Sequence, residues 1–172
     1  CLLERVDILF WINRILSWEP NALIVLLGVS MGAATVLMAS GEDLPGNVKA
    51  VIADCGYTSE WDEFQREADA LHIPWFPVLN ATSVLSKIRD GYDFKQASAL
   101  AQVKKSRIPT LFIHGSSDEL VPYSMLGELY AAAACEKEEL TVEGAGHALS
   151  SSVAPTLYWR TVEDFIAKYL DR

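Results

Sequence analysis

Three short runs of mostly apolar residues and a fourth run of mixed polarity recur along the chain, and helical patterns separate them. The runs cover residues 22–27, 48–54, 109–114 and 138–142. Runs of this length are typical of strands that are buried on both faces of a parallel sheet. Helices are expected at 2–18, 31–40, 122–134 and 155–170. Strands that alternate with helices predict an α/β fold, with a parallel sheet, flanking helices and right-handed crossovers.

The segment from Ala22 to Ser40 contains no charged residue. Its length alone would suggest a transmembrane helix. We reject that interpretation because Ser30 lies between Gly28 and Gly32 near the middle of the segment. The first half is strand-like and the second half is rich in alanine, so the segment predicts a strand, a turn and a helix.

Residues 59–107 show no strand pattern and predict a small helical insert, or cap region, within the domain. Ser59 with Asp62 three residues later resembles a capping box for a helix that runs to about residue 71. Pro74 and Pro77 are expected to end that helical pattern.

Two shorter helices are expected at 81–89 and 94–105, the second capped by Asp93. Three aromatic residues of the insert, Trp61, Trp75 and Phe76, are open to two interpretations. They either pack between helices or line a substrate pocket.

At 172 residues the chain is long enough for one domain with a real core, and we expect a single domain over 1–172. The formal net charge of −9 argues against nucleic acid or an anionic membrane surface as a partner. Cys1, Cys55 and Cys135 lack the spacing of a disulfide framework or a zinc site. The chain opens without an initiator Met, so we expect a fragment. The compartment stays open: cytoplasmic by default, membrane-anchored or exported if an N-terminal segment is missing.

The strand, turn and helix around Gly28-Val29-Ser30-Met31-Gly32 form the pattern of a nucleophile elbow. Such a turn lifts a serine hydroxyl off the end of a sheet. We expect both glycines to lie so close to neighbouring backbone that a Cβ would clash.

Candidate partners for the serine follow the other strands. Asp54 ends the second strand, Asp118 follows the third and His147 follows the fourth. Functional groups gather at the carboxyl ends of parallel strands. A serine needs a base, and an imidazole needs a carboxylate on its other nitrogen. The order Ser, Asp, His is the order expected with a nucleophile elbow.

Each assignment has an alternative. Asp54 could be the acid instead of Asp118, and Glu119 would need the loop to shift by one residue. His114 is interpreted as a packed structural histidine. His72 is interpreted as a favourable residue at a helix end.

Three motifs together resemble the α/β-hydrolase family over nearly the whole chain. They are Gly28-Val29-Ser30-Met31-Gly32, His114-Gly115-Ser116-Ser117-Asp118 with Val121-Pro122, and Gly144-Ala145-Gly146-His147. The chain looks most like bacterial serine hydrolases of the esterase and serine-aminopeptidase type, in which Asp-Cys-Gly-Tyr-Thr-Ser at 54–59 is also at home.

The resemblance implies that Ser30 is the nucleophile, His147 the general base and then acid, and Asp118 the orienting acid. It also implies that the backbone N–H of Met31 is one donor of the oxyanion hole. The substrate would be a small-molecule ester or amide, and no metal or organic cofactor is implied.

The chain departs from the family pattern because only the four strands of the second half of its sheet are found. The second oxyanion donor would come from a loop after an earlier strand. Losing one such donor typically costs about a hundred- to a thousand-fold in rate. The 22–27 strand would be an exposed edge that invites self-association, and this chain alone could be weak or inert.

Three functions therefore stay open. The first is a serine hydrolase that cleaves carboxylic esters through an acyl-enzyme. The second is a peptidase or amidase of the same fold, because the fold does not separate esters from amides. The third is a non-catalytic α/β module that retains the three residues as a relic.

Overall fold

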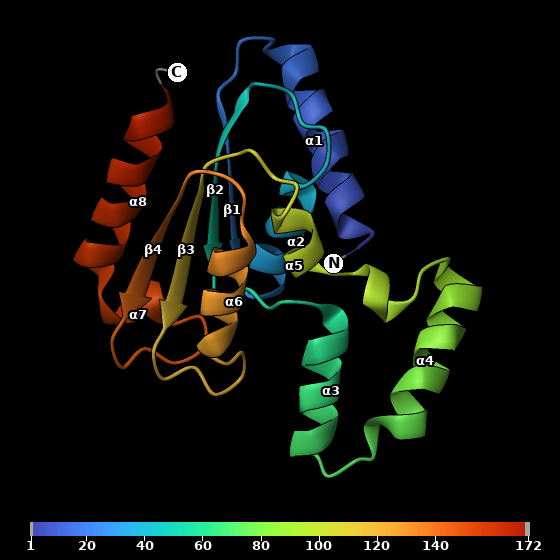
Figure 1. The fold of residues 1–172 in the computed structure, drawn as a ribbon. Helices are drawn as coiled ribbons and strands as arrows, with labels where there is room; N and C mark the ends of the chain where they lie inside the picture. The colour runs from blue at the N-terminus through green and yellow to red at the C-terminus, as the bar shows by residue number, and fades with distance from the viewer. Residues whose placement is uncertain (1, 171–172) are drawn as a thin grey trace.

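The computed structural model describes residues 2–170 and contains the expected parallel sheet (Figure 1). The strands are β1 (Ile24–Val29), β2 (Val48–Asp54), β3 (Thr110–Gly115) and β4 (Lys137–Val142), in the spatial order β1-β2-β3-β4. The α/β fold class is confirmed. Val29 pairs with Asp54, Asp54 with Ile113, and Gly115 with Val142, so the four carboxyl ends meet at one edge.

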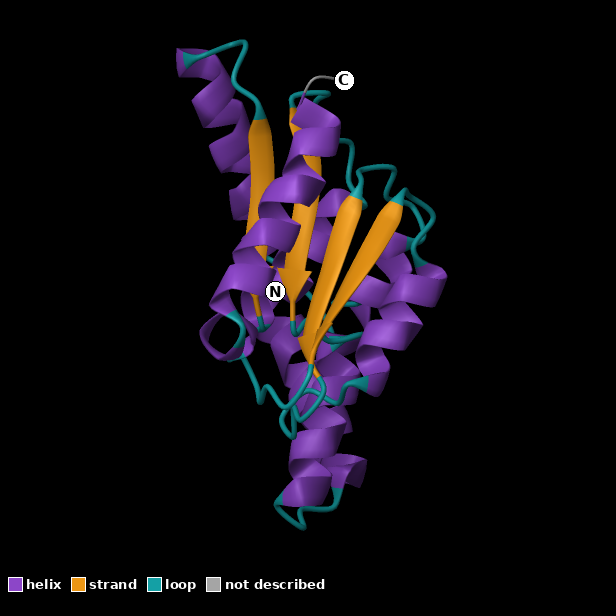
Figure 2. Cartoon of the chain, turned by 90° about the vertical axis from the view of Figure 1, so that its left-hand side faces the viewer, coloured by secondary structure: helices purple, strands orange, loops and turns teal. Residues whose placement is uncertain are grey.

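Helices cover both faces of the sheet (Figure 2). One face carries α1 (Glu4–Trp18), α2 (Met31–Ser40), α5 (Ala99–Val103) and α6 (Ser124–Ala132), and the other carries α7 (Ser150–Val153) and α8 (Pro155–Leu170). Alternation along the strands divides the core in the same way. In β2, Val51 and Ala53 face the first layer while Ala50 and Ile52 face the second.

The uncharged segment 22–40 divides at Ser30 into β1 and α2, as predicted. Every residue of α2 from Ala33 to Ser40 is buried, which explains the lack of charge. Within the described part of the chain, no helix has the length and apolarity needed to cross a membrane.

The insert differs from its prediction in detail. Helix α3 (Glu60–Ala70) begins as expected, with the Ser59 hydroxyl accepting the Asp62 N–H at 3.0 Å. Helix α4 (Trp75–Asp90) begins before residue 81, where its start was predicted. Its backbone departs from helical geometry at Phe76 and is helical again directly after that residue. The two helices project beyond the carboxyl ends of the strands (Figures 1 and 2).

The single helix predicted at 94–105 is wrong. The chain instead forms a 3₁₀ turn, η1 (Phe94–Gln96), and then α5. Asp93 caps η1, and Ser98 caps α5 by accepting the Ala101 N–H at 3.1 Å, so the second cap divides the segment. Because α5 packs on α2 with Val103 1% exposed, the end of the insert belongs to the core.

The three aromatic residues of the insert lie among its own helices. Trp61 lines a cavity between α3, α4 and η1, and the Lys95 ammonium lies 4.4 Å from its ring centre. Trp75 contacts Phe76 edge to face at the start of α4. None of the residues that line this cavity is a candidate site residue.

Candidate active site

Ser30 occupies a strained turn between β1 and α2. Its backbone has φ 55° and ψ −118°, a conformation that residues with a side chain rarely adopt. The Ser30 N–H donates to the Asp54 carbonyl at 2.8 Å, and the Ser30 carbonyl accepts the Ala34 N–H at 3.1 Å. These two bonds fix the turn to the end of β2 and to the first turn of α2.

The two glycines of the turn differ in what they need. A Cβ on Gly28 would overlap the carbonyl group of Gly32 and lie 2.7 Å from the Ala33 nitrogen, so a glycine is required there. The same expectation for Gly32 is wrong, because a Cβ at that position would meet no described atom within 4 Å outside its own stretch of helix. The glycine at position 28 thus allows the first turn of α2 to lie directly against the end of β1.

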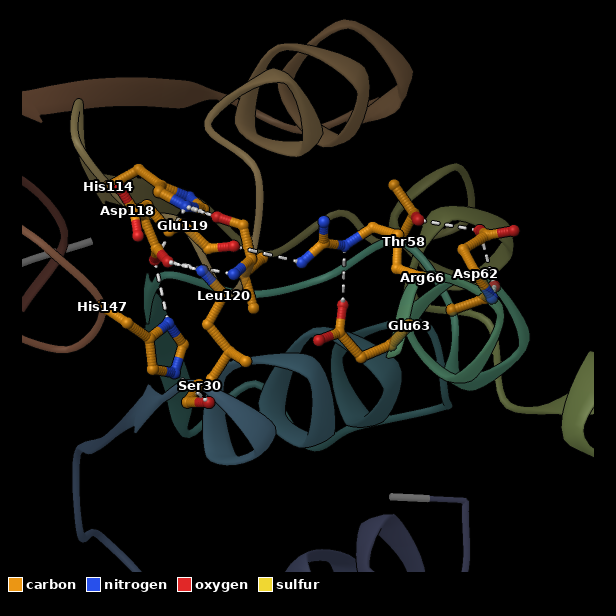
Figure 3. Close-up of polar contacts among 12 residues, drawn as sticks. Ser30, Thr58, Asp62, Glu63, Arg66, His114, Asp118, Glu119, Leu120 and His147 are labelled. Carbon is orange, nitrogen blue, oxygen red and sulfur yellow. Dashed lines mark hydrogen bonds and ion pairs between the residues drawn. The ribbon is translucent and has the colours of Figure 1, made fainter. Parts of the chain in front are cut away.

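The structure brings Ser30, His147 and Asp118 into one chain of hydrogen bonds (Figure 3). His147 Nε2 lies 2.8 Å from Ser30 Oγ, and His147 Nδ1 lies 2.9 Å from Asp118 Oδ2. Asp118 can only accept at this contact when ionised, so Nδ1 carries the proton and donates it. Nε2 of the neutral ring is then the acceptor for the Ser30 hydroxyl.

Asp118 is held by backbone donors on the side away from His147. Its Oδ1 accepts the N–H groups of Leu120 at 3.0 Å and Val121 at 2.9 Å. Its side chain is fully buried, whereas that of His147 is 20% exposed. A carboxylate with this many donors keeps its orientation toward the imidazole.

The alternative acids take other places. Asp54 is buried, and its Oδ1 accepts the Ser150 hydroxyl at 3.2 Å rather than a proton of His147. Burial raises the pKa of Asp54, while hydrogen bonds from the Ser150 and Tyr158 hydroxyls oppose the rise. Glu119 contributes its backbone carbonyl, which accepts from Arg66 at 3.4 Å.

Neither of the other two histidines has a described hydrogen bond to Ser30 or His147, although His114 contacts Asp118. His114 is 1% exposed, and its Nε2 lies 2.9 Å from the Val121 carbonyl and 3.3 Å from Asp118 Oδ2. It therefore packs beneath the loop that carries Asp118, in agreement with a structural role. His72 is exposed after the end of α3, with φ 57°.

The segment that carries His147 is fixed to the loop after β3. A Cβ on Gly115 would overlap the Ala145 carbonyl oxygen, so a glycine there allows the two segments to approach. The Ser116 hydroxyl donates to Glu143 Oε2 at 2.9 Å and accepts the Gly144 N–H at 2.9 Å. The sequence motifs included Ser116 without assigning it a role, and only the spatial approach of the two loops reveals one.

Helix α3 reaches the same loop through Arg66 (Figure 3). Arg66 Nη2 donates to the Glu119 carbonyl, and Arg66 Nε lies 3.7 Å from Glu63 Oε2. Burial raises the pKa of Glu63, and the positive charge of Arg66 opposes this rise. No sequence pattern indicated that Arg66 would join the insert to the site.

Cys55, Asp118 and His147 are the described residues that could offer ligands to one metal ion, with ligand atoms within 4.8 Å of one another. The donor set fits an ion poorly. Burial raises the pKa of the Cys55 thiol to about 12, and metals bind the thiolate. The Asp118 and His147 atoms are already bonded to each other.

The parallel sheet, its flanking helices and the serine turn at a strand end define the protein as an α/β hydrolase by fold. The chain belongs to the prolyl oligopeptidase family, whose sequence pattern it matches over residues 18–172.

Two relatives are similar to this chain in sequence. YqkD of Bacillus subtilis (strain 168) is 30% identical over 161 residues, which are 90% of this chain and 53% of YqkD. The α/β-hydrolase domain-containing protein WAV2 of Arabidopsis thaliana is 30% identical over 153 residues, 85% of this chain and 47% of WAV2. The chain thus spans about half the length of these relatives.

Solved structures agree on the fold. An esterase from Pyrococcus furiosus superposes with a TM-score of 0.72 at 18% identity, over 97% of this chain and 62% of the esterase. The acylaminoacyl peptidase of Pyrococcus horikoshii gives 0.70 at 19% identity, over 98% of this chain and 28% of the peptidase. At such identities the likeness concerns the fold alone.

Proposed function

We propose that this chain carries the catalytic serine of a hydrolase that cleaves carboxylic esters through an acyl-enzyme. The observation that supports this most is the hydrogen-bonded series from Asp118 through His147 to Ser30, with separations of 2.9 and 2.8 Å. These separations are within the reach that proton transfer requires.

The reaction starts when Ser30 Oγ attacks the ester carbonyl carbon and its proton passes to His147 Nε2. Asp118 stabilises the imidazolium through its bond to Nδ1. The tetrahedral intermediate expels the alcohol, which takes the proton from Nε2, and the acyl group remains on Oγ. A water molecule then gives one proton to Nε2 and attacks the acyl carbon. The bond from the acyl carbon to Ser30 Oγ breaks, Oγ takes the proton back from Nε2, and the acid is released.

The backbone N–H of Met31 is the proposed oxyanion donor. It follows the nucleophile and opens α2, where helix N-termini favour negative charge. The second donor, expected on a loop after an earlier strand, stays a prediction.

An apolar substrate is favoured by the side chains that follow each site residue. Met31 directly follows Ser30, Leu120 comes two residues after Asp118, and Leu149 two residues after His147. All three are exposed, at 57%, 44% and 49% respectively. An ester with an apolar acyl or alcohol group would cover part of this surface.

The test is labelling with a fluorophosphonate, read by intact mass, on this chain and on Ser30→Ala. Ser17→Ala is the matched control, because Ser17 is an exposed serine at the end of α1. We expect one adduct in the wild type and in Ser17→Ala, and none in Ser30→Ala. A folded protein without an adduct, also when a longer form of the protein is tested, would favour the non-catalytic module.

The second candidate, a peptidase or amidase, is supported by membership of a family named after an oligopeptidase. A short-chain p-nitrophenyl ester and an aminoacyl p-nitroanilide, compared by kcat/KM, discriminate the two. Turnover of the anilide at a rate comparable to the ester would contradict the ester proposal.

A further inference from the structure

Asp54 contacts both the turn that presents Ser30 and the segment that follows His147. It is the last residue of β2 and pairs with Val29 on one side and Ile113 on the other. Its backbone carbonyl accepts the Ser30 N–H at 2.8 Å. The backbone of this one residue therefore holds the turn that presents Ser30.

The Asp54 side chain reaches the other part of the site. Its Oδ1 accepts the hydroxyl of Ser150, which is completely buried and opens α7 three residues after His147. The hydroxyl of Tyr158, on α8, also donates to the Asp54 carboxylate. The start of α7, directly after the loop that carries His147, is thus hydrogen-bonded to the last residue of β2.

A buried carboxylate is costly unless its hydrogen bonds compensate for the lost water. Asp54 is 1% exposed, so an apolar residue of similar size would avoid this cost. The groups that interact with it are the hydroxyls of Ser150 and Tyr158 through hydrogen bonds, and the imidazoles of His114 and His147 and the Cys55 thiol through electrostatics. Asp54 does not touch the ring nitrogen of His147, which Asp118 occupies.

We propose that Asp54 is a positioning residue that sets the distance between His147 and Ser30, through Ser150 on one side and its own backbone carbonyl on the other. This inference rests on the proposed function. Without the bond to Ser150, the start of α7 and the loop before it lose their fixed point on the sheet, and His147 samples positions farther from Ser30 Oγ. A displacement of about 1 Å at a reacting group costs up to roughly a hundred-fold in rate.

The experiment compares four variants by their rates of labelling with the fluorophosphonate. Ser150→Ala removes the donor, Asp54→Asn keeps an acceptor oxygen in the same place, and Asp118→Asn removes the acid of the triad. Ser152→Ala is the control, because Ser152 is exposed on the same helix α7. We expect Ser150→Ala to slow labelling about 10- to 100-fold, Asp54→Asn to stay within about threefold of the wild type, and the control to be unchanged.

A second readout does not depend on activity. The proton of His147 Nδ1 that is bonded to Asp118 gives a low-field NMR signal, which we expect in the wild type and Asp54→Asn and expect to be broadened in Ser150→Ala. If the wild type shows this signal but is not labelled, the proposed function fails. The signal in Ser150→Ala then still tests whether the bond between Asp54 and Ser150 positions His147.

Two results would overturn the inference. One is a folded Ser150→Ala protein with the wild-type rate and signal. The other is a loss in Asp54→Asn as large as the roughly 10⁴-fold loss expected for Asp118→Asn, which would make Asp54 an acid of the reaction instead.

Discussion

The strained backbone at Ser30 predicts that glycine there stabilises the protein more than alanine does. A residue with a side chain at φ 55° and ψ −118° costs about 1–3 kcal/mol of strain. Ser30→Ala and Ser30→Gly both lose the hydroxyl and its bond to His147, so their difference isolates the backbone. Glycine relieves the strain but loses about 0.5–1 kcal/mol more conformational freedom on folding.

The expected balance is a free energy of unfolding about 0.5–2 kcal/mol higher for Ser30→Gly than for Ser30→Ala. For a chain of this size, each kcal/mol corresponds to a shift in Tm of about 2–4 °C. Urea denaturation and thermal unfolding of the two variants measure the difference, and neither variant should react with the fluorophosphonate.

Ala167→Gly is the matched control, because it makes the same exchange at an exposed position inside α8. There glycine relieves no strain and should cost about 0.5–1 kcal/mol. If Ser30→Gly is no more stable than Ser30→Ala while Ala167→Gly behaves as expected, the turn is not strained and the reasoning is refuted.

Four further outcomes are expected. Gly115→Ala should lower the free energy of unfolding by about 1–3 kcal/mol and slow labelling, since its Cβ would overlap the segment that carries the histidine; unchanged stability and rate would contradict this. Burial raises the pKa of Asp54 above 3.8, so its contribution to stability is present at low pH and is lost as pH rises through the folded-state pKa. Asp54→Asn should therefore gain free energy of unfolding relative to the wild type as pH rises from about 4, and urea unfolding that shows a constant difference would refute it. Cys55, with a pKa of about 12, should be alkylated by iodoacetamide after the less buried Cys135; peptide mapping that finds the reverse order would contradict the buried position. Leu27 is 43% exposed on β1, whose described partner strand is β2 alone, so we propose self-association through this edge. Leu27→Lys should shift sedimentation toward the monomer, and a wild type that is monomeric throughout would refute it.

Elements whose pattern has one physical explanation could be predicted from the sequence. Strands β2 and β3 follow from burial on both faces, because such strands consist mostly of apolar residues. Strands β1 and β4 are the outer strands of the described sheet and are only partly buried. The insert was harder to predict, since small differences between caps decide where short helices begin. Ser98 supplied a second cap that hydrophobic spacing does not reveal, and α7 is too short to have a pattern of its own.

The candidate site also contains some residues that the sequence indicates and others that only the structure reveals. The candidate residues Ser30, Asp118 and His147 could be named from the sequence because each follows a strand and carries a group that the proposed reaction would need. Their supports could not, because they come from distant segments. Ser150 lies 96 residues from Asp54 and Ser116 lies 27 from Glu143, and neither pair has a spacing that indicates contact.

Backbone strain gives independent support for the location of the site. Four described residues other than glycine have positive φ: Ser30 (55°), Cys55 (49°), His72 (57°) and Ala148 (58°). Three of these are site residues or their direct neighbours, since Cys55 follows Asp54 and Ala148 follows His147. Such conformations persist only where surrounding contacts impose them, and they gather at functional sites. The bonds that join Ser30 to Asp54, and Asp54 to Ser150, are contacts of that kind. The strained backbone therefore lies mainly in the turns that bring together Ser30, His147 and the residues hydrogen-bonded around them.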